Sequence, residues 1–432
     1  MFRSPAVLLL LAFCCLGAGH GQADDWPQWR GPTRDGVWRE QGVVEKFSVE
    51  RLPLKWRVPI TSGYCGPTVA DGRVFVMDRL DTPTQIERTH AFDEQTGKEL
   101  WSHQYDCEYT VQYVAGPRAS VSIDGGRAYA LGTMGHLHCY DAGTGKILWA
   151  KDLNEEYKIR MPIWGISASP LVDNDLLIVQ VGGAEGACLV AFDKVNGAER
   201  WRALSDRASY SAPIIIEQAG RRVLVCWTGE NVVGLDPASG KVGWEHPFKP
   251  TRMIINVATP IVDENRLFVS SFYDGSLMLK LLPDRLGVEQ IWRRLGPDER
   301  QTDSLHSIIS TPYLQGDYVY GVDSYGELRC LDAKTGDRVW ESQEAVPRER
   351  WATIHMVRNG EKIWMFNDRG ELIMSRLSPR GFEEISRAKL IDPTTEQLRR
   401  KDGVCWSHPA YANKHVFARN DKELVCASLA AE

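Results

Sequence analysis

One nine-residue phrase recurs along the chain and limits the folds that the chain can adopt. It reads DEQTGKELW from Asp93, DAGTGKILW from Asp141, DPASGKVGW from Asp236 and DAKTGDRVW from Asp332. Each copy contains an Asp, a turn with a Gly, and a Trp at a fixed distance from the Asp. A phrase that returns in this form indicates a repeat architecture.

The Trp residues at the ends of these units recur at intervals of 48, 52, 43, 48 and 48 residues. This period is typical of four-stranded propeller blades rather than of helical repeats. Each unit also begins with two short apolar runs separated by Gly, Asp or Asn, as in CGPTVADGRVFVMD, which indicates a hairpin. A third run and then the phrase follow, so we predict four-stranded antiparallel blades in an all-β propeller.

The phrase is interpreted as a strand, a turn and an outer strand. The Asp carboxylate accepts hydrogen bonds from turn N–H groups, and the Gly takes the positive φ of a short loop. The Trp fills the wedge between neighbouring blades, where its burial is worth roughly 5 kcal/mol gross. The residues assigned to blade docking are Trp56, Asp93, Gly97, Trp101, Asp141, Gly145, Trp149, Asp193, Gly197, Trp201, Asp236, Gly240, Trp244, Trp292, Asp332, Gly336 and Trp340.

The last of eight units, roughly residues 406–429, supplies three strands and no outer strand. The segment PLKWRVPI, residues 53–60, carries Trp56 in the same local setting as the other Trp residues. We therefore predict that this N-terminal strand completes the last blade of an eight-bladed ring, because closure removes two open sheet edges. Residues 53–432 then form a single propeller domain.

The two segments before the ring have different expected roles. Residues 1–23 read as a removable export signal, with Arg3, the apolar run AVLLLLAFCCL and the small-residue site GQA. Phe13 precedes Cys14 and Cys14 precedes Cys15, where lipoprotein signals prefer a small residue, which argues against a lipid anchor. We therefore expect a periplasmic or extracellular monomer with no transmembrane segment. Residues 24–52 form an arm that is expected to pack Trp26 and Trp29 on the ring, a partner-binding role being the alternative.

Charge and cysteine content exclude some functions. The formal net charge is -6, so the chain lacks the basic excess that binds nucleic acid. The mature chain would keep eight Cys with no CxxC spacing, and disulfides Cys65–Cys405 or Cys65–Cys107 remain open. The sequence HLH places His136 and His138 on the expected solvent side of a strand, and no metal site is predicted.

The loops that enter the innermost strands carry the candidate binding residues. In a propeller these loops gather around one end of the central channel, where aromatic, Arg, Asn and His side chains suit a polar or ring-bearing ligand. The alternative is that these side chains only fill the channel. The candidates are Arg160, Trp164, Tyr210, Arg252, Asn256, Asp303, His306, Trp351, Trp406 and His408, with Arg350 beside Trp351.

The phrases AFDEQTGKELW, CYDAGTGKILW and LDPASGKVGW resemble the pyrroloquinoline-quinone (PQQ) type of β-propeller repeat. The resemblance covers almost the whole mature chain and implies the eight-bladed fold of the quinoprotein alcohol dehydrogenase type. The head WPQWRGPTRDG is similar to that of exported bacterial propellers common in planctomycetes. Those proteins are usually named by the repeat or by likeness to the outer-membrane barrel-assembly lipoprotein.

The chain departs from the dehydrogenases at the cofactor site that the resemblance implies. They hold calcium with a Glu, an Asn and an Asp beside a catalytic Asp, and carry an adjacent Cys–Cys disulfide over the quinone. Here the Cys–Cys pair lies in the signal, and Asn256 and Asp303 match that set only by location.

Three functional hypotheses follow. The favoured one is an exported non-catalytic propeller that binds a protein, a polymer or a small ligand. The second is a PQQ- and calcium-dependent oxidoreductase acting on alcohols or sugars at the channel mouth, and the third is another enzyme, such as a sugar-acting lyase or hydrolase. Fold alone does not decide among them.

Overall fold

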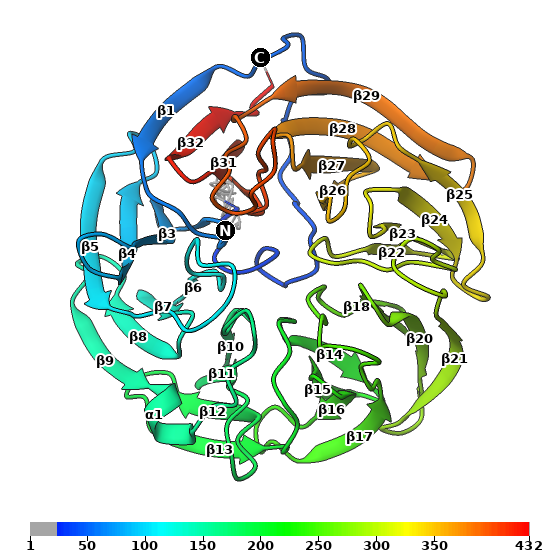
Figure 1. Ribbon diagram of the computed structural model, residues 1–432, viewed down its shortest axis with the longest axis horizontal. Helices are drawn as coiled ribbons and strands as arrows, with labels where there is room; N and C mark the ends of the chain where they lie inside the picture. The colour runs from blue at the N-terminus through cyan, green and yellow to red at the C-terminus, as the bar shows by residue number, and fades with distance from the viewer. Residues whose placement is uncertain (1–23, 432) are drawn as a thin grey trace, which may run out of the picture.

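The computed structural model describes residues 24–431, so the expected export signal lies outside the described residues. Eight four-stranded antiparallel sheets surround a central channel as the blades of a propeller (Figure 1). The eight-bladed all-β prediction is therefore confirmed. Within residues 24–431, no helix has the length and apolar character needed to cross a membrane.

Each blade runs outward from the channel through four strands. Blades 1 to 4 consist of β2 (Thr68–Ala70), β3 (Arg73–Leu80), β4 (Ile86–Asp93) and β5 (Glu99–Asp106); β6 (Ser122–Asp124), β7 (Arg127–Leu131), β8 (His136–Asp141) and β9 (Ile147–Asp152); β10 (Leu171–Asp173), β11 (Leu176–Gln180), β12 (Leu189–Asp193) and β13 (Glu199–Ala203); β14 (Ile214–Gln218), β15 (Arg221–Trp227), β16 (Asn231–Leu235) and β17 (Val242–Pro247). The short helix α1 (Leu153–Tyr157) follows β9.

Blades 5 to 8 consist of β18 (Ile261–Asp263), β19 (Arg266–Ser271), β20 (Gly275–Leu281) and β21 (Val288–Arg294); β22 (Tyr313–Gln315), β23 (Tyr318–Val322), β24 (Leu328–Asp332) and β25 (Arg338–Ser342); β26 (Ile354–Asn359), β27 (Lys362–Asn367), β28 (Glu371–Ser378) and β29 (Gly381–Lys389); β30 (Ala410–Ala412), β31 (His415–Arg419), β32 (Glu423–Ser428) and β1 (Leu54–Pro59).

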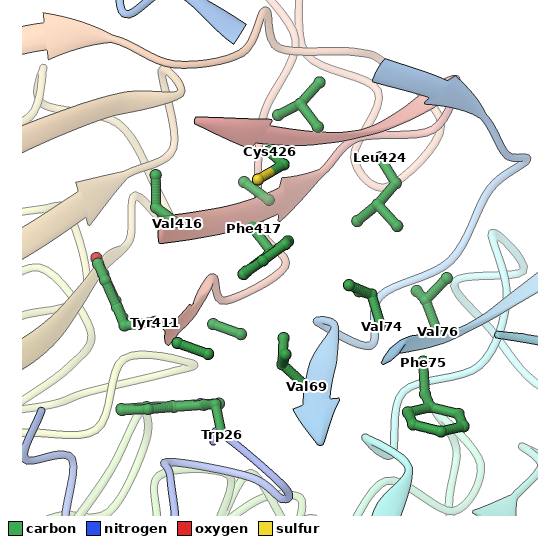
Figure 2. Close-up of a cluster of buried hydrophobic side chains, with 14 of the residues drawn as sticks. Trp26, Val69, Val74, Phe75, Val76, Tyr411, Val416, Phe417, Leu424 and Cys426 are labelled. Atoms are coloured by element: carbon green, nitrogen blue, oxygen red, sulfur yellow. The ribbon is translucent and has the colours of Figure 1, made fainter. Parts of the chain in front are cut away.

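The two ends of the chain meet in blade 8. Strand β1 pairs antiparallel with β32, where Trp56 lies opposite Cys426 and Val58 opposite Leu424. The predicted closure by the N-terminal strand is confirmed. Between blades 8 and 1, Trp26 of the arm packs beside Val69 of β2 and Tyr411 of β30 in a buried apolar cluster (Figure 2).

The repeated phrase joins each blade to the next one. The Trp101 indole of blade 1 donates a hydrogen bond of 3.0 Å to the Ala142 carbonyl in the turn of blade 2. Gly145 in that turn has φ +73°, and a Cβ built on it would lie 2.6 Å from the Trp101 ring. The Asp141 carboxylate accepts the Thr144 N–H at 2.8 Å and fixes the turn.

The same contact recurs around the ring. The Gly of one phrase leaves space for the Trp indole of the preceding blade. The other indole–glycine pairs are Trp56–Gly97, Trp149–Gly197, Trp201–Gly240 and Trp292–Gly336. Where the next blade lacks the phrase, the indole finds another acceptor. Trp244 donates to Gln218 Oε1 at 2.8 Å, and Trp340 donates to the Ser378 carbonyl at 2.8 Å.

The arm crosses the middle of the ring (Figure 1). Trp26 exchanges two backbone hydrogen bonds of 2.9 Å with Val69 in blade 1, and the Trp38 N–H donates to the Arg358 carbonyl in blade 7 at 2.7 Å. The Arg34 side chain, which is 3% exposed, reaches blades 3 and 4. The arm therefore closes one end of the channel before it runs along β29, the outer strand of blade 7, where the Leu52 N–H donates to the Lys389 carbonyl at 2.9 Å.

Arg34 is held by backbone carbonyls. Its guanidinium donates to the carbonyls of Ser169, Pro170 and Pro213. Burial lowers the pKa of Arg34 to about 9, which leaves the group charged at neutral pH. A buried positive charge thus lies at the closed end of the channel.

The structure answers one open question about side chains and corrects one expectation. All eight Cys of the described chain are free and buried, so neither disulfide is present; the Cys65 thiol instead donates to the Met77 carbonyl and the Cys405 thiol to the Asp392 carbonyl. The expected solvent exposure of His138 is wrong. Its ring is 8% exposed because Tyr105 of the preceding blade stacks on it at 4.6 Å.

Candidate functional site

The open end of the channel holds a pocket of about 930 Å³, including its part open to solvent. The loops that enter the innermost strands of all eight blades contribute to its wall, and the arm contributes its floor. The lining residues are Trp29, Tyr64, Tyr113, Arg118, Trp164, Ser167, Ser169, Tyr210, Ala212, Val257, Ile308, Ile309, Trp351, His355, Trp406 and His408.

Aromatic rings form most of the wall. Trp164 lies 5.2 Å from Tyr210 between ring centroids, and Trp351 lies 6.3 Å from Trp406. Tyr113 reaches across from blade 2 and lies 5.6 Å from Trp164. Tyr113 and Trp351 both have left-handed backbones, with φ of +58° and +66°. Such strained non-glycine positions concentrate at functional sites.

Arg118 is the cationic side chain of the wall. Its guanidinium lies 5.0 Å from the Tyr64 ring centroid and donates to the Gln112 carbonyl at 3.0 Å and to Thr133 Oγ1 at 3.2 Å. Within residues 24–431 it forms no ion pair, and no Asp or Glu lines the pocket. The positive charge of Arg118 is therefore not neutralised by a carboxylate.

Two buried imidazoles lie at the floor. Burial lowers the pKa of His355 to about 4 and that of His408 to about 3, so both are neutral at pH 7. His408 Nδ1 lies 3.3 Å from the Pro409 carbonyl, and Nε2 lies 2.8 Å from Ser120 Oγ. If Nδ1 carries the proton, Nε2 accepts from the serine hydroxyl. Trp29 covers this His408 ring at 4.4 Å.

This Ser–His pair does not have the accessibility of a nucleophilic site. Ser120 is fully buried and does not line the pocket. Burial raises the pKa of Tyr210 to about 12, so neither this phenol nor the two imidazoles titrate near neutral pH. The two imidazoles and this phenol are therefore all uncharged at pH 7.

The structure brings together five of the ten predicted candidates, namely Trp164, Tyr210, Trp351, Trp406 and His408. Arg350, beside Trp351, does not line the pocket; its guanidinium lies 4.2 Å from the Trp351 ring centroid and pairs with Glu299 at 2.7 Å. The other five candidates are Arg160, Arg252, Asn256, Asp303 and His306, and none of them lines the pocket.

Those five residues have other surroundings. Arg160 and Arg252 are exposed, and Arg252 lies 5.2 Å from the Tyr273 ring centroid. Asp303 pairs with Arg294 at 3.2 Å. Two side chains are fully buried and support the backbone: Asn256 donates to the Thr228 carbonyl at 2.9 Å, and His306 Nδ1 lies 2.9 Å from the Phe272 carbonyl.

Sequence reasoning missed several lining residues. Tyr64 and Arg118 occupy the strand-entry loops of blades 1 and 2, in SGYCGPTV and GPRASVSI, and the register used for blades 3 to 8 would have found them. Trp29 carried no such signal, because the arm has no repeat to align with. Tyr113 lies five residues before Arg118 in an irregular loop and likewise follows no repeat.

These features define an eight-bladed PQQ-type propeller whose channel is closed at one end and carries an aromatic pocket at the other. Residues 86–342 match the family model of the outer membrane protein assembly factor BamB. That match spans more than half of the chain, and the chain belongs to this family. No curated protein sequence matches the chain significantly.

Solved structures share the fold at low sequence identity. BamB from Moraxella catarrhalis is 16% identical, with a TM-score of 0.60 over 87% of this chain and 99% of its own. Quinohemoprotein alcohol dehydrogenase from Comamonas testosteroni is 14% identical, with a TM-score of 0.67 over 95% of this chain and 81% of its own. A europium-containing methanol dehydrogenase is 13% identical, with a TM-score of 0.65 over 91% and 89%.

The lining residues do not fit the quinone–calcium site of the dehydrogenases. Calcium takes six to eight oxygen ligands, with carboxylates prominent among them. The pocket has no carboxylate, and the described residues contain no cluster of three or more His, Cys, Asp or Glu able to hold a metal ion.

Proposed function

We propose that the protein is an exported, non-catalytic propeller that binds an apolar, ring-bearing small molecule in this pocket. The observation that carries the proposal is the composition of the wall: seven Trp and Tyr side chains line it, and no carboxylate does. Pockets with many aromatic side chains and few polar groups bind small organic ligands.

The hydrogen bonds of the wall favour an apolar ligand over a sugar. The Tyr64 hydroxyl donates to the Gln397 carbonyl at 3.0 Å, and the Tyr210 hydroxyl accepts the Trp164 N–H at 3.3 Å. His355 Nε2 lies 2.8 Å from the Trp406 carbonyl. The indole N–H groups of Trp351 and Trp406 have no partner among the described residues and could donate to a ligand, but these donors are fewer than the hydroxyls of a sugar need.

The charges favour a neutral or anionic ligand over a cation. Aromatic cages often bind quaternary ammonium groups. Here Arg118 lies in the wall and Arg34 at the closed end of the channel, and neither has a carboxylate partner in the described chain. Both guanidiniums repel a cation.

A direct test uses three aromatic dyes of similar size: anionic 1-anilinonaphthalene-8-sulfonate, neutral N-phenyl-1-naphthylamine and a cationic acridine. We expect the first two to bind with one site per protein. Trp164→Ala removes a half-exposed wall ring and should weaken binding about tenfold or more. Arg252→Ala, on an exposed side chain outside the pocket, is the matched control. Unchanged binding by the Trp164 variant, or a preference for the acridine, would contradict the proposal.

The oxidoreductase hypothesis is tested separately. The purified protein is mixed with PQQ and calcium and assayed for dye-linked oxidation of alcohols and sugars. We expect neither bound-quinone absorbance nor dye reduction. Dye reduction that depends on added PQQ would contradict the binding proposal and support a catalytic function.

Family membership favours a second candidate, a scaffold for a protein partner. In that case the same pocket would receive an aromatic side chain of the partner, because rings buried in such pockets dominate interface energies. Pull-down from the native envelope with wild type and the Trp164 variant distinguishes this scaffold from a small-molecule carrier.

A further inference from the structure

Tyr113 occupies the place where a ring of the ligand would fit best. Its ring lies 5.6 Å from Trp164, 6.0 Å from Trp351 and 6.3 Å from Trp406. These three indoles come from blades 3, 7 and 8, whereas Tyr113 comes from the loop before β6 in blade 2. The phenol ring therefore bridges the pocket mouth and fills the slot between the indoles.

The segment that carries Tyr113, residues 110–115, is weakly attached between two firm ends. On one side Tyr109 donates to the buried Glu87 carboxylate, and on the other the Pro117 carbonyl accepts the backbone N–H groups of Tyr64 and Cys65 at 2.8 Å. Between these ends the segment makes one backbone hydrogen bond to another loop, from Gln112 to the Ile163 carbonyl at 2.9 Å. It joins no sheet.

Two arginines supply its remaining attachments. Arg79 donates to the Val114 carbonyl at 2.8 Å, and Arg118 donates to the carbonyls of Gln112 and Tyr113. Arg118 also lines the pocket. An anionic group that enters the pocket would compete with these carbonyls for the Arg118 donors, since charged acceptors form the stronger hydrogen bonds.

The backbone at Tyr113 also favours release. Its φ of +58° places a bulky aromatic residue in the left-handed region, which costs a non-glycine residue free energy. The neighbouring Gln112 and Val114 side chains are exposed, and only the small Ala115 of the segment is buried. The contacts of the Tyr113 ring with the three indoles therefore add to the arginine hydrogen bonds that hold the segment down.

We propose that residues 110–115 form a lid, and that Tyr113 must leave the slot before an aromatic ring of the ligand can enter it. The proposal rests on the proposed function of the pocket. The ligand ring and the Tyr113 ring cannot occupy the slot at the same time. When an anionic ligand binds, Arg118 donates its hydrogen bonds to the anionic group instead of to the lid carbonyls. Binding is then limited by lid opening.

The test measures association of 1-anilinonaphthalene-8-sulfonate by stopped flow with wild type and Tyr113→Asn. Asn tolerates the left-handed backbone, so the change removes the ring without new strain. We expect the association rate constant to rise about tenfold or more and the Kd to fall. Val195→Asn, on an exposed side chain in a turn of blade 3 outside the pocket, should bind as wild type does. Tyr113→Gly provides a second variant suited to the same φ.

If Tyr113 is a fixed part of the wall, the Tyr113→Asn change should raise the Kd for the dye instead of lowering it. If Tyr113 only contacts the ligand, removal of its ring weakens binding, and that result overturns the lid while leaving the pocket intact. If the dye binds neither wild type nor any variant, the pocket proposal fails and the lid with it. Amide exchange in wild type needs no variant: saturating dye should speed exchange across residues 110–115, and slower exchange there overturns the lid.

Discussion

The contact between each indole and the glycine of the next blade can be tested with two substitutions in one blade. Gly145→Ala places a methyl group 2.6 Å from the Trp101 ring, at a residue with φ +73°. Gly126→Ala is the matched control. Gly126 has φ +74° in the same blade, and a Cβ there meets nothing within 4 Å. The backbone strain is therefore the same, and only the clash with the indole differs.

The magnitude follows from these two contributions. An alanine in the left-handed region costs about 1–2 kcal/mol, and this cost applies to both variants. Overpacking of a filled contact costs roughly 1–3 kcal/mol more, and this cost applies to Gly145 alone. We expect Gly145→Ala to lower the free energy of unfolding by about 1–3 kcal/mol more than Gly126→Ala does.

Urea unfolding followed by tryptophan fluorescence and circular dichroism measures the difference. A double-mutant cycle then assigns its origin, because Trp101→Leu removes the ring that the methyl group would strike. In that background the two alanine variants should cost the same. Equal costs in the wild-type background, or an excess cost that survives Trp101→Leu, would refute the packing of the indole on the glycine.

Three further outcomes follow from the fold. Deletion of residues 53–60 should leave no folded protein, because β32 then has no partner on its outer edge; a cooperatively melting deletion variant would contradict ring closure. Arg34→Leu should cost about 3 kcal/mol in urea unfolding, since three buried carbonyls lose their donor. Acid should destabilise the protein as the pH falls from about 6.5 to 4. Burial lowers the pKa of His355 to about 4, so His355 takes up its proton in the unfolded chain at a higher pH than in the folded protein. This difference should lower the free energy of unfolding by an amount on the order of 3 kcal/mol at pH 4. The dependence on pH should be shallower in His355→Gln, and an unchanged slope would refute this assignment.

The sequence predicted most of the fold because the fold is periodic. The spacing of the Trp residues indicates blade number, and Trp56, outside any complete unit, indicates where the ring closes. The partner of each Trp was less visible, because Trp101 packs on Gly145 of the next unit and not on its own turn. Contacts between repeats follow from geometry that a single repeat does not contain.

The site was only half predictable, for a related reason. Strand-entry residues alternate between facing the channel and supporting the blade, and the sequence does not mark the difference. Asn256 and His306 are residue types that often contact ligands, but here their side chains form hydrogen bonds with backbone carbonyls. Trp29 and Tyr113 belong to segments without periodicity, so no alignment of repeats could place them on the pocket.

Closure through β1 also sets an order of events during folding. Trp56 lies opposite Cys426, 370 residues further along the chain, so the first strand waits for the last before either edge is covered. Ordering so long a stretch of chain is slow compared with local hairpin formation. A polypeptide that ends before β32 would leave the sheet edges next to the ring closure unpaired. Only chains that include β32 can therefore complete blade 8 and close the ring.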